Sequence, residues 1–219
     1  SYYHKLQRMV LDELGFKNVP IYTPNQSISF YRDLGVVGTY FIRRAYQGIV
    51  ATDMLEKCLR EIRPYEVECG MTDSVYQAFL DSICRAILDG RDLLPVLEKA
   101  RDAFAAIPVD RNKKRPLIGV IGEIFVRSNR FSNENLIRKV EEFGGEAWLP
   151  PFTEWMIYTN YVRIRETKEE KMYYDFILNW IINSIQVHDL HRLEKPFEKF
   201  LRNFHEPPMP QIEDWAIPF

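Results

Sequence analysis

The chain of 219 residues lacks the common short motifs of nucleotide and hydrolytic chemistry, and it contains only four histidines. A GxGxxG segment and a P-loop are both absent, so the sequence gives no support for nucleotide binding. GxSxG and HExxH are absent too. His188 and His191 share a helical pattern, but a metal site needs at least a third ligand, and Asp189 points elsewhere on that helix. We therefore predict no metal site and no complete active site.

Cysteine is scarce as well. Cys58, Cys69 and Cys84 form no CxxC pair, and histidine is too sparse to complete a zinc set. Cys58 and Cys84 lie among helical apolar residues, where free cysteine behaves as a small hydrophobe, so we predict that both are buried and reduced. Cys69 lies in a predicted turn, and its sequence context does not decide whether it is buried or has a functional role. Three reduced cysteines fit a cytoplasmic protein.

Long apolar runs and an excess of one charge are also missing. No stretch approaches 18 apolar residues, so we expect no membrane span. A formal net charge of −2 and a pI near 6.1 argue against non-specific binding of nucleic acid. The chain has no signal-peptide pattern, and it begins directly with a helical pattern rather than with Met. We therefore expect a piece of a longer protein, with residues 206–219 as a linker to a missing domain.

The most informative stretch reads as strand, polar turn, helix and strand. Residues 117–121 are an uninterrupted apolar run, which is typical of a strand buried on both faces of a parallel sheet. Ser132 or Asn133 can cap the helix that follows. Residues 147–149 form the second strand, and a third short strand is predicted over residues 19–22. The fold class predicted is α/β, with a small parallel Rossmann-like sheet.

The connector over residues 123–133 leaves the carboxyl end of the first of these strands, where open α/β sheets bind ligands. It is longer than a simple link requires and is rich in polar side chains. Glu123, Arg127, Asn129 and Asn133 are the candidate residues for a ligand site or an interdomain cleft. The alternative interpretation is a solvated loop in which the asparagines make turns and caps.

The rest of the chain is predicted to be helical. Residues 1–29 and 109–160 make up the α/β core, and residues 30–108 form a large helical insertion. Residues 161–205 are C-terminal helices that pack on the core. The apolar sequence YYDFILNWIINSI within them is predicted to be core or interface.

The segment IGVIGEIFVRSNRFSNENLIRKVEEFGGEAWLPPFTEW resembles the 2-hydroxyacyl-CoA dehydratase superfamily, in particular its activase-like and double-cubane-cluster members. In those proteins a strand ends in G-E-I-[YF]-V-R, and a polar turn with N-x-[FY]-[AS]-N follows. The matching residues here are Gly122, Glu123, Ile124, Phe125, Val126, Arg127, Asn129, Phe131, Ser132 and Asn133. Less specific similarity, including RRAYQGIVATDML and EIRPYE, extends over most of the chain.

The resemblance implies an oxygen-sensitive, ATP-dependent reductive system. In this superfamily an activator with an ATPase fold passes a low-potential electron to an iron–sulfur partner, which acts on a CoA thioester or another small molecule. Glu123, Arg127 and Asn133 would then orient a substrate or hold an interdomain surface. The partners implied are the flanking cluster-binding and ATPase domains or subunits.

This sequence differs from the superfamily pattern in the cysteines that bind the iron–sulfur cluster. The resemblance places the cluster cysteines just before Tyr2 and in a domain beyond Phe219, and Cys58, Cys69 and Cys84 do not replace them. Because an iron–sulfur cluster needs about four thiolates, we expect this piece to hold no cluster and to catalyse nothing alone.

Three functional hypotheses follow from the sequence. The first is a structural or substrate-side domain of a dehydratase- or activase-like protein. The second is a non-catalytic module that binds a small anion near Arg127 and Arg130 at a helix amino terminus. The third is a protein-interaction module, which predicts that the aromatic helix over residues 173–185 is exposed and dimeric.

Overall fold

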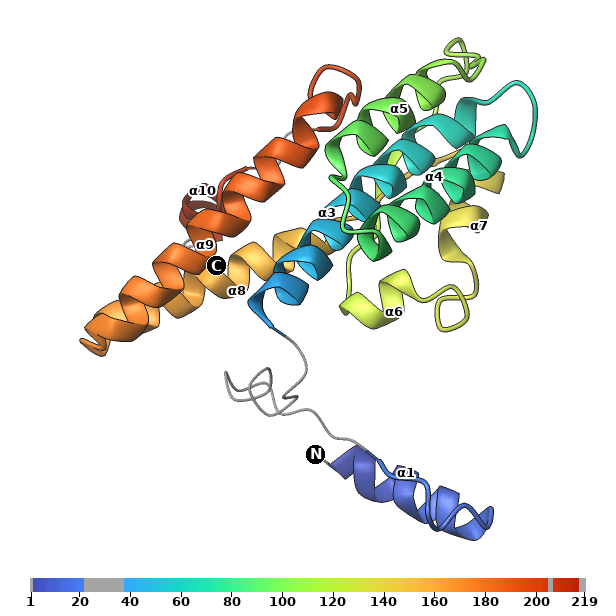
Figure 1. The fold of residues 1–219 in the computed structure, drawn as a ribbon. Helices are drawn as coiled ribbons and strands as arrows, with labels where there is room; N and C mark the ends of the chain where they lie inside the picture. The colour runs from blue at the N-terminus through green and yellow to red at the C-terminus, as the bar shows by residue number, and fades with distance from the viewer. Residues whose placement is uncertain (1, 22–37, 205–206, 217–219) are drawn as a thin grey trace. The chain divides into compact units, whose positions relative to one another are not determined.

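The computed structural model describes residues 2–21, 38–204 and 207–216. The chain divides into two compact units, Ser1–Ile42 and Arg43–Phe219. The colours of Figure 1 follow the chain from one end to the other.

The first unit contains helix α1 (Tyr2–Glu13), as the opening sequence pattern predicts. The helix ends in a turn at Gly15, where φ is 86° and a side chain would be strained. Arg8 closes this turn by donating hydrogen bonds to the carbonyl oxygens of Phe16 and Val19. Residues 19–21 form no strand, so the prediction of a third strand is wrong for them, and Tyr22 lies outside the described residues.

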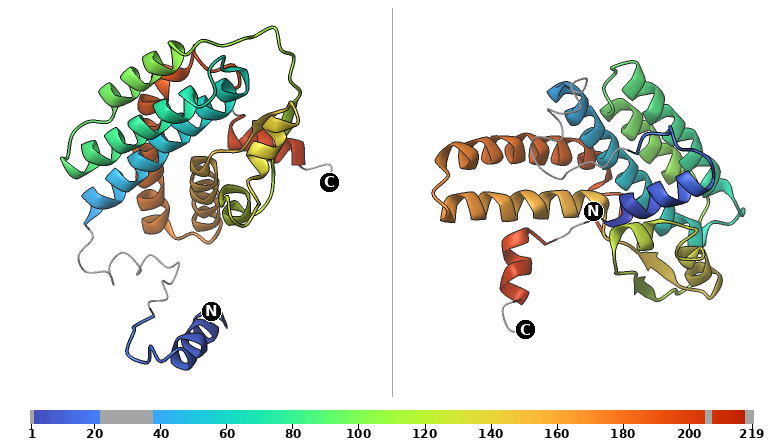
Figure 2. Two further views of the ribbon diagram at one scale, coloured as in Figure 1. Left: turned by 90° about the vertical axis from the view of Figure 1, so that its right-hand side faces the viewer. Right: turned by 90° about the horizontal axis from the view of Figure 1, so that it is seen from below.

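The second unit is built around helices α3 (Thr39–Ile62), α4 (Met71–Leu88) and α5 (Leu94–Ala105). These three helices lie side by side in Figures 1 and 2. A 3-10 turn, η1 (Arg63–Tyr65), ends α3. Gly48 does not interrupt α3, and a Cβ at this position would lie only 2.8 Å from Cδ1 of Ile87 on α4. The glycine therefore permits close packing of the two helices.

The main hydrophobic core lies among these helices and receives side chains from the end of the chain. Its fully or almost fully buried members include Tyr46, Met54, Leu55, Cys58, Ile83, Leu97, Phe104, Leu193 and Phe197. The burial predicted for Cys58 is confirmed. The burial predicted for Cys84 is wrong, because this residue lies on the outer face of α4 and is exposed.

Strands β1 (Leu117–Gly119) and β2 (Glu146–Trp148) form a two-stranded parallel sheet, which Figure 2 shows from below. Ile118 pairs with Ala147. Helices α6 (Ile124–Ser128) and α7 (Leu136–Glu142) connect the two strands. The strand–helix–strand order predicted for this stretch is confirmed.

The predicted burial of the first strand is wrong. Leu117 is 52% exposed and Ile118 40% exposed, because the sheet has two strands in the described residues and its small core forms on one side. That core consists of Val120, Ala147 and Leu149, with Ile137 and Val140 of α7 packed against them. The structure therefore shows a mostly helical fold with a small parallel sheet.

Helices α8 (Phe152–Glu169) and α9 (Tyr173–Glu194) run side by side as a hairpin, with a tight turn at Lys171, where φ is 59°. Helix α9 continues through His191 and is followed by the 3-10 turn η2 (Lys195–Phe197). Within residues 206–219, which were predicted to be a linker, the structure contains α10 (Met209–Ala216).

The outer half of this hairpin, residues 158–185, is called the arm. Large apolar side chains of α9 are exposed along it, and we call this set the arm face. The arm face consists of Tyr173, Tyr174, Ile177, Leu178, Trp180, Ile181, Ile182 and Ile185. The exposure predicted by the interaction hypothesis is confirmed.

Candidate functional site

The connector over residues 123–133 is not an open loop, because its first half folds into α6. Glu123 is the N-cap residue of this helix, and its Oε2 accepts a hydrogen bond of 2.9 Å from the backbone nitrogen of Val126. A carboxylate at a helix start satisfies an otherwise unpaired N–H group and opposes the positive end of the helix dipole. The carboxylate of Glu123 therefore has a structural role as the cap of α6.

Asn129 and Asn133 close the second half of the connector. Oδ1 of Asn129 accepts from the backbone nitrogen of Ser132 at 2.9 Å. Nδ2 of Asn133 donates to the carbonyl oxygens of Val126 and Arg127, at 3.0 and 2.8 Å, and its Oδ1 accepts from the nitrogen of Leu136 at 3.3 Å. The N-cap residue of α7 is Asn135, so neither Ser132 nor Asn133 caps this helix as predicted, although Asn133 contacts its first backbone nitrogen. These bonds match the interpretation of the asparagines as turn residues.

Arg127 differs from the other three candidates. Its guanidinium is half-buried, and Nε makes no hydrogen bond with any residue that the structure describes. The side chains of Glu123, Asn129 and Asn133 bond within their own segment. The structure therefore brings the four predicted residues into one segment but does not join their side chains around a common point.

A small cavity beside this connector collects charged groups, of which the sequence analysis had singled out only Arg130. Its volume is about 70 Å³, and we call it the arginine cavity. Three parts of the chain line it: α3 with η1, the connector with α7, and the end of β2. The lining residues are Glu56, Leu59, Arg60, Arg63, Ser128, Arg130, Asn133, Asn135, Ile137, Arg138 and Leu149.

Two of the four arginines are held by carboxylates on α3 and α7. Arg60 contacts Oε2 of Glu56 at 2.7 Å, four residues earlier on α3. The guanidinium of Arg63 is buried and donates to both carboxylate oxygens of Glu141, at 2.8 and 2.7 Å. Burial alone would lower the pKa of Arg63, but the hydrogen bonds and the charge of Glu141 outweigh it and raise the pKa. Arg63 therefore stays charged.

Asp73 of α4 joins the arginines from different elements. It accepts from Arg63 at 3.0 Å and from Arg138 at 2.6 Å. Burial alone would raise the pKa of Asp73, but the hydrogen bond from Arg138 and the charge of Arg63 outweigh it and lower the pKa. The ion pairs hold α4, η1 and α7 together, so the wall of the cavity is fixed by a charged network.

Arg130 is the exception within the arginine cavity. Its side chain is exposed and forms no hydrogen bond or ion pair with any residue in the described ranges. The cavity thus has three guanidinium groups positioned by carboxylates and a fourth at its edge. The four guanidinium groups outnumber the three carboxylates that pair with them, Glu56, Asp73 and Glu141. The one excess positive charge suits a small anion, because guanidinium groups bind carboxylate and phosphate oxygens.

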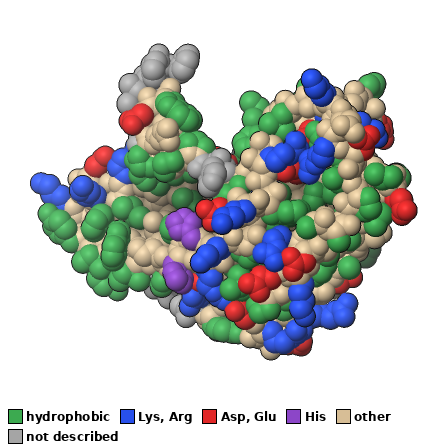
Figure 3. Space-filling view, turned by 90° about the horizontal axis from the view of Figure 1, so that it is seen from above, with side chains coloured by type: hydrophobic (Ala, Val, Ile, Leu, Met, Phe, Trp, Pro, Cys, Tyr) green, Lys and Arg blue, Asp and Glu red, His purple; other side chains and the backbone are tan. Residues whose placement is uncertain are grey.

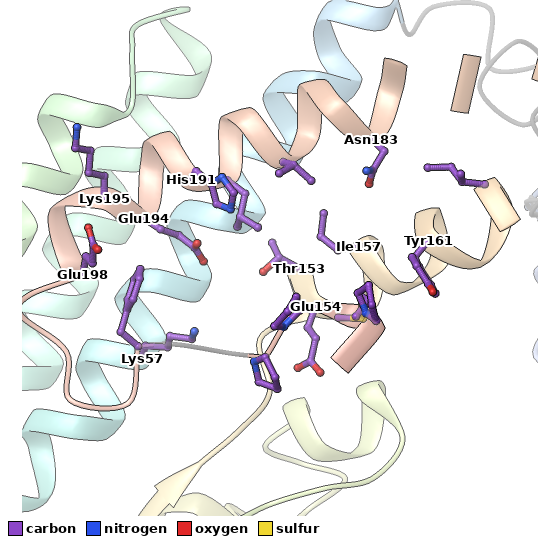
Figure 4. A pocket seen from close by; sticks show the side chains of 18 residues that line it. Lys57, Thr153, Glu154, Ile157, Tyr161, Asn183, His191, Glu194, Lys195 and Glu198 are labelled. Atoms are coloured by element: carbon purple, nitrogen blue, oxygen red, sulfur yellow. The ribbon is translucent and has the colours of Figure 1, made fainter. Parts of the chain in front are cut away.

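A second cavity lies between α8, α9 and residues 207–210, with a volume of about 760 Å³. Figure 4 shows Lys57, Glu194 and Glu198 toward one end of it, and Asn183 and Tyr161 toward the other. The middle of the lining includes the apolar side chains of Ile157, Ile164, Val187 and Leu190. Because cations and carboxylates mix at its polar end, the cavity does not select a ligand of one charge.

Among the residues that the structure describes, no three of His, Cys, Asp and Glu lie close enough to hold a metal ion. His191 lines the larger cavity. No helix within the described ranges is long and apolar enough to cross a membrane.

The arginines of α3, η1 and α7 were missed because residues 30–108 were predicted to be a helical insertion and the candidate site was confined to residues 123–133. Arg60 and Arg63 lie three residues apart, which places them on one side of a helix, but a single helix cannot show what faces it. Comparison with known proteins gives no further assignment: no family model, no curated protein and no solved structure matches the chain. Function is therefore inferred from the residues and their geometry.

Proposed function

We propose that this chain is a structural and substrate-side domain of a 2-hydroxyacyl-CoA dehydratase- or activase-like protein. In this role it binds the anionic part of an acyl thioester or a related acid and catalyses nothing alone. The observation that carries the proposal is the convergence of four arginines on a cavity beside the G-E-I-F-V-R connector. The ligand-binding groups thus lie next to the segment that carries the resemblance.

The size of the arginine cavity sets the class of ligand. A volume of about 70 Å³ admits a carboxylate or a single phosphate group, but not a whole cofactor. The remainder of the ligand would extend outward past Arg130. Because Arg63 and Arg138 are already placed by Asp73 and Glu141, little side-chain entropy remains to be lost there on binding.

The exposure of β1 supports the interdomain part of the proposal. Leu117 and Ile118 are apolar strand residues that face solvent in this chain. In a longer protein, a neighbouring domain would cover them and extend the two-stranded unit into a wider Rossmann-like sheet. That neighbouring domain would carry the iron–sulfur cluster, and an ATPase component would supply the electron. The cytoplasmic location belongs to the same proposal.

The binding proposal is tested by calorimetric titration of the chain with malonate, inorganic phosphate and CoA at low salt. We expect Arg130→Gln to weaken binding by about 10-fold, because a hydrogen bond to a charged group contributes roughly 1.5–3 kcal/mol. The matched control is Arg101→Gln, which removes an exposed arginine of α5 that pairs with Asp102. Equal weakening by both variants would mean a general attraction of charge and would refute a site at the arginine cavity.

The dehydratase part of the proposal has a separate test. Anaerobic iron and sulfide analysis, with an ultraviolet–visible spectrum, is made on this chain and on a longer protein that contains it. Iron and sulfide in the longer protein but not in this chain support a scaffold role. A longer protein without iron contradicts the dehydratase-like role, and anion binding at the arginine cavity would then stand as a non-catalytic function.

A further inference from the structure

The arm has an inverted distribution of polar and apolar side chains. On α9, Asn179 is buried and Asn183 is half-buried on the side that faces α8. Nδ2 of Asn160 on α8 donates to Oδ1 of Asn183 at 3.4 Å and to Oε1 of Gln186 at 2.5 Å. The apolar residues of the arm face are exposed instead. A helical pair that is stable by itself buries its apolar stripe and exposes its amides.

The arm is held rigidly at its base. Asp189 of α9 is almost fully buried and accepts two hydrogen bonds of 2.7 Å from Arg43, and one of 2.9 Å from Gln47. Leu193, one turn further, belongs to the main core. The outer part of α9 cannot rotate to bury its apolar residues without breaking these contacts. The arm face therefore stays exposed unless something else covers it.

We propose that the arm face is a dimer interface that packs against the same face of a second copy of this chain. The area is sufficient. Side chains of the arm face are 37–79% exposed. Eight large side chains at these exposures present roughly 1,000 Å² per copy, and a standard stable interface needs about 800 Å² from each partner. Figure 3 shows hydrophobic side chains, in green, gathered at the left of the view, where the arm lies.

The charges of the arm favour a second copy of the chain over an anionic membrane surface. Between Tyr173 and Val187 the only ionisable acid or base is Asp175, near the start of α9. The tip of the arm carries both signs in equal number, as Lys168, Glu169, Glu170 and Lys171. An anionic membrane would favour an excess of Lys and Arg there, which the tip does not have.

The geometry of a two-fold pair follows from the position of Ile181. This residue lies near the middle of the arm face, so two arms that cross antiparallel would bring the two copies of Ile181 close to the two-fold axis. The paired arms would form four helices, with the polar row of each hairpin inside that hairpin and the two apolar faces against each other. Both copies contribute the same surface, as a closed dimer requires.

The test is the molar mass of the intact chain in solution, measured by sedimentation velocity over a wide concentration series. We expect a dimer that Ile181→Glu weakens by about 1,000-fold, because one central interface side chain contributes roughly 2 kcal/mol, or about 30-fold, and each dimer loses two. The control, Leu88→Glu, changes an 86%-exposed leucine at the end of α4. We expect it to leave the dimer unchanged, and circular dichroism verifies the helix content of both variants.

Further measurements separate a two-fold contact from non-specific adhesion. An equal mixture of Ile181→Glu and Ile181→Lys chains should regain the dimer that each variant loses. A wild-type chain that is monomeric at every concentration overturns the proposal, as does a dimer that Ile181→Glu leaves intact. A monomer that co-sediments with vesicles of anionic phospholipid would assign the arm face to a membrane surface and overturn it equally.

Discussion

Asp53 joins the main helical body to the hairpin, and its removal should destabilise the chain measurably. It lies on α3 and is 6% exposed. Its two carboxylate oxygens accept from the backbone nitrogens of Phe152, at 3.1 Å, and Thr153, at 2.9 Å. These are the first two residues of α8, so a side chain from a distant helix serves as the N-terminal cap.

The expected magnitude follows from two opposing contributions. Asp53→Ala removes hydrogen bonds of a charged acceptor, each contributing roughly 1.5–3 kcal/mol, and leaves the N–H groups unsatisfied. The same change also removes the cost of burying the carboxylate, and burial raises the pKa of Asp53 despite the hydrogen bonds from Thr153 and Phe152. We expect a net loss of about 2 kcal/mol in the free energy of unfolding.

The assay is urea denaturation followed by far-ultraviolet circular dichroism at neutral pH. Asp53→Asn keeps one acceptor and removes the buried charge, so it should cost about 1 kcal/mol or less. Asp102→Ala, an exposed acid of α5, should change little and serves as the control. A loss below about 0.5 kcal/mol for Asp53→Ala would refute the reasoning, because a cap between distant helices should contribute more than that.

The pH dependence of Asp53 has an unusual sign. Its pKa in the folded chain lies above the ordinary value of 3.8, so the folded state binds more protons than the unfolded state just above pH 3.8. The contribution of Asp53 to stability therefore falls as the pH rises through the raised pKa. Because the Asn side chain does not titrate, the denaturation midpoint of the wild-type chain should rise further above that of Asp53→Asn as the pH is lowered into this window.

Two further predictions concern Asp73 and the cysteines. The pKa of Asp73 is lowered, because the hydrogen bond from Arg138 and the nearby positive charge outweigh the effect of burial. The stabilisation by Asp73 is therefore present above the ordinary pKa of 3.8 and is lost as the pH falls through the lowered pKa. In acid denaturation, Asp73→Asn should lose less stability than the wild-type chain over this pH range. Burial raises the pKa of the Cys58 thiol, so a thiol reagent should modify Cys69 and Cys84 in the folded chain and Cys58 only after unfolding. Modification of all three at equal rates would contradict the burial of Cys58.

The helices could be read from the sequence because their apolar spacing and end signals are local. Residues 30–108 were predicted to be helical, and the described part of this range contains α3, α4 and α5. The turn bonds of Asn129 and Asn133 also depend only on neighbours in the chain. Such features are decided within a few residues, where side-chain spacing and backbone preference act directly.

The burial of an element could not be read in this way. The apolar run of β1 indicated a strand buried on both faces, but nothing in the described chain covers its second side. Cys84 shows the same limit on α4: an apolar local sequence predicted burial, and the tertiary packing turned this residue outward. Local pattern shows that a face is apolar, but the elements that pack against it decide whether it meets solvent.

The sequence determined one part of the candidate site, and the tertiary structure determined the other. The sequence located the polar connector with Glu123, Arg127, Asn129 and Asn133, and it left open whether these residues bind a ligand or stabilise a turn. Packing of α3 and α7 around that connector brought Arg63 and Arg138 to one cavity, although they lie far apart in the chain. Cavities and ion pairs between distant segments exist only after the chain has folded, because they depend on side chains whose separation in sequence says nothing about their separation in space.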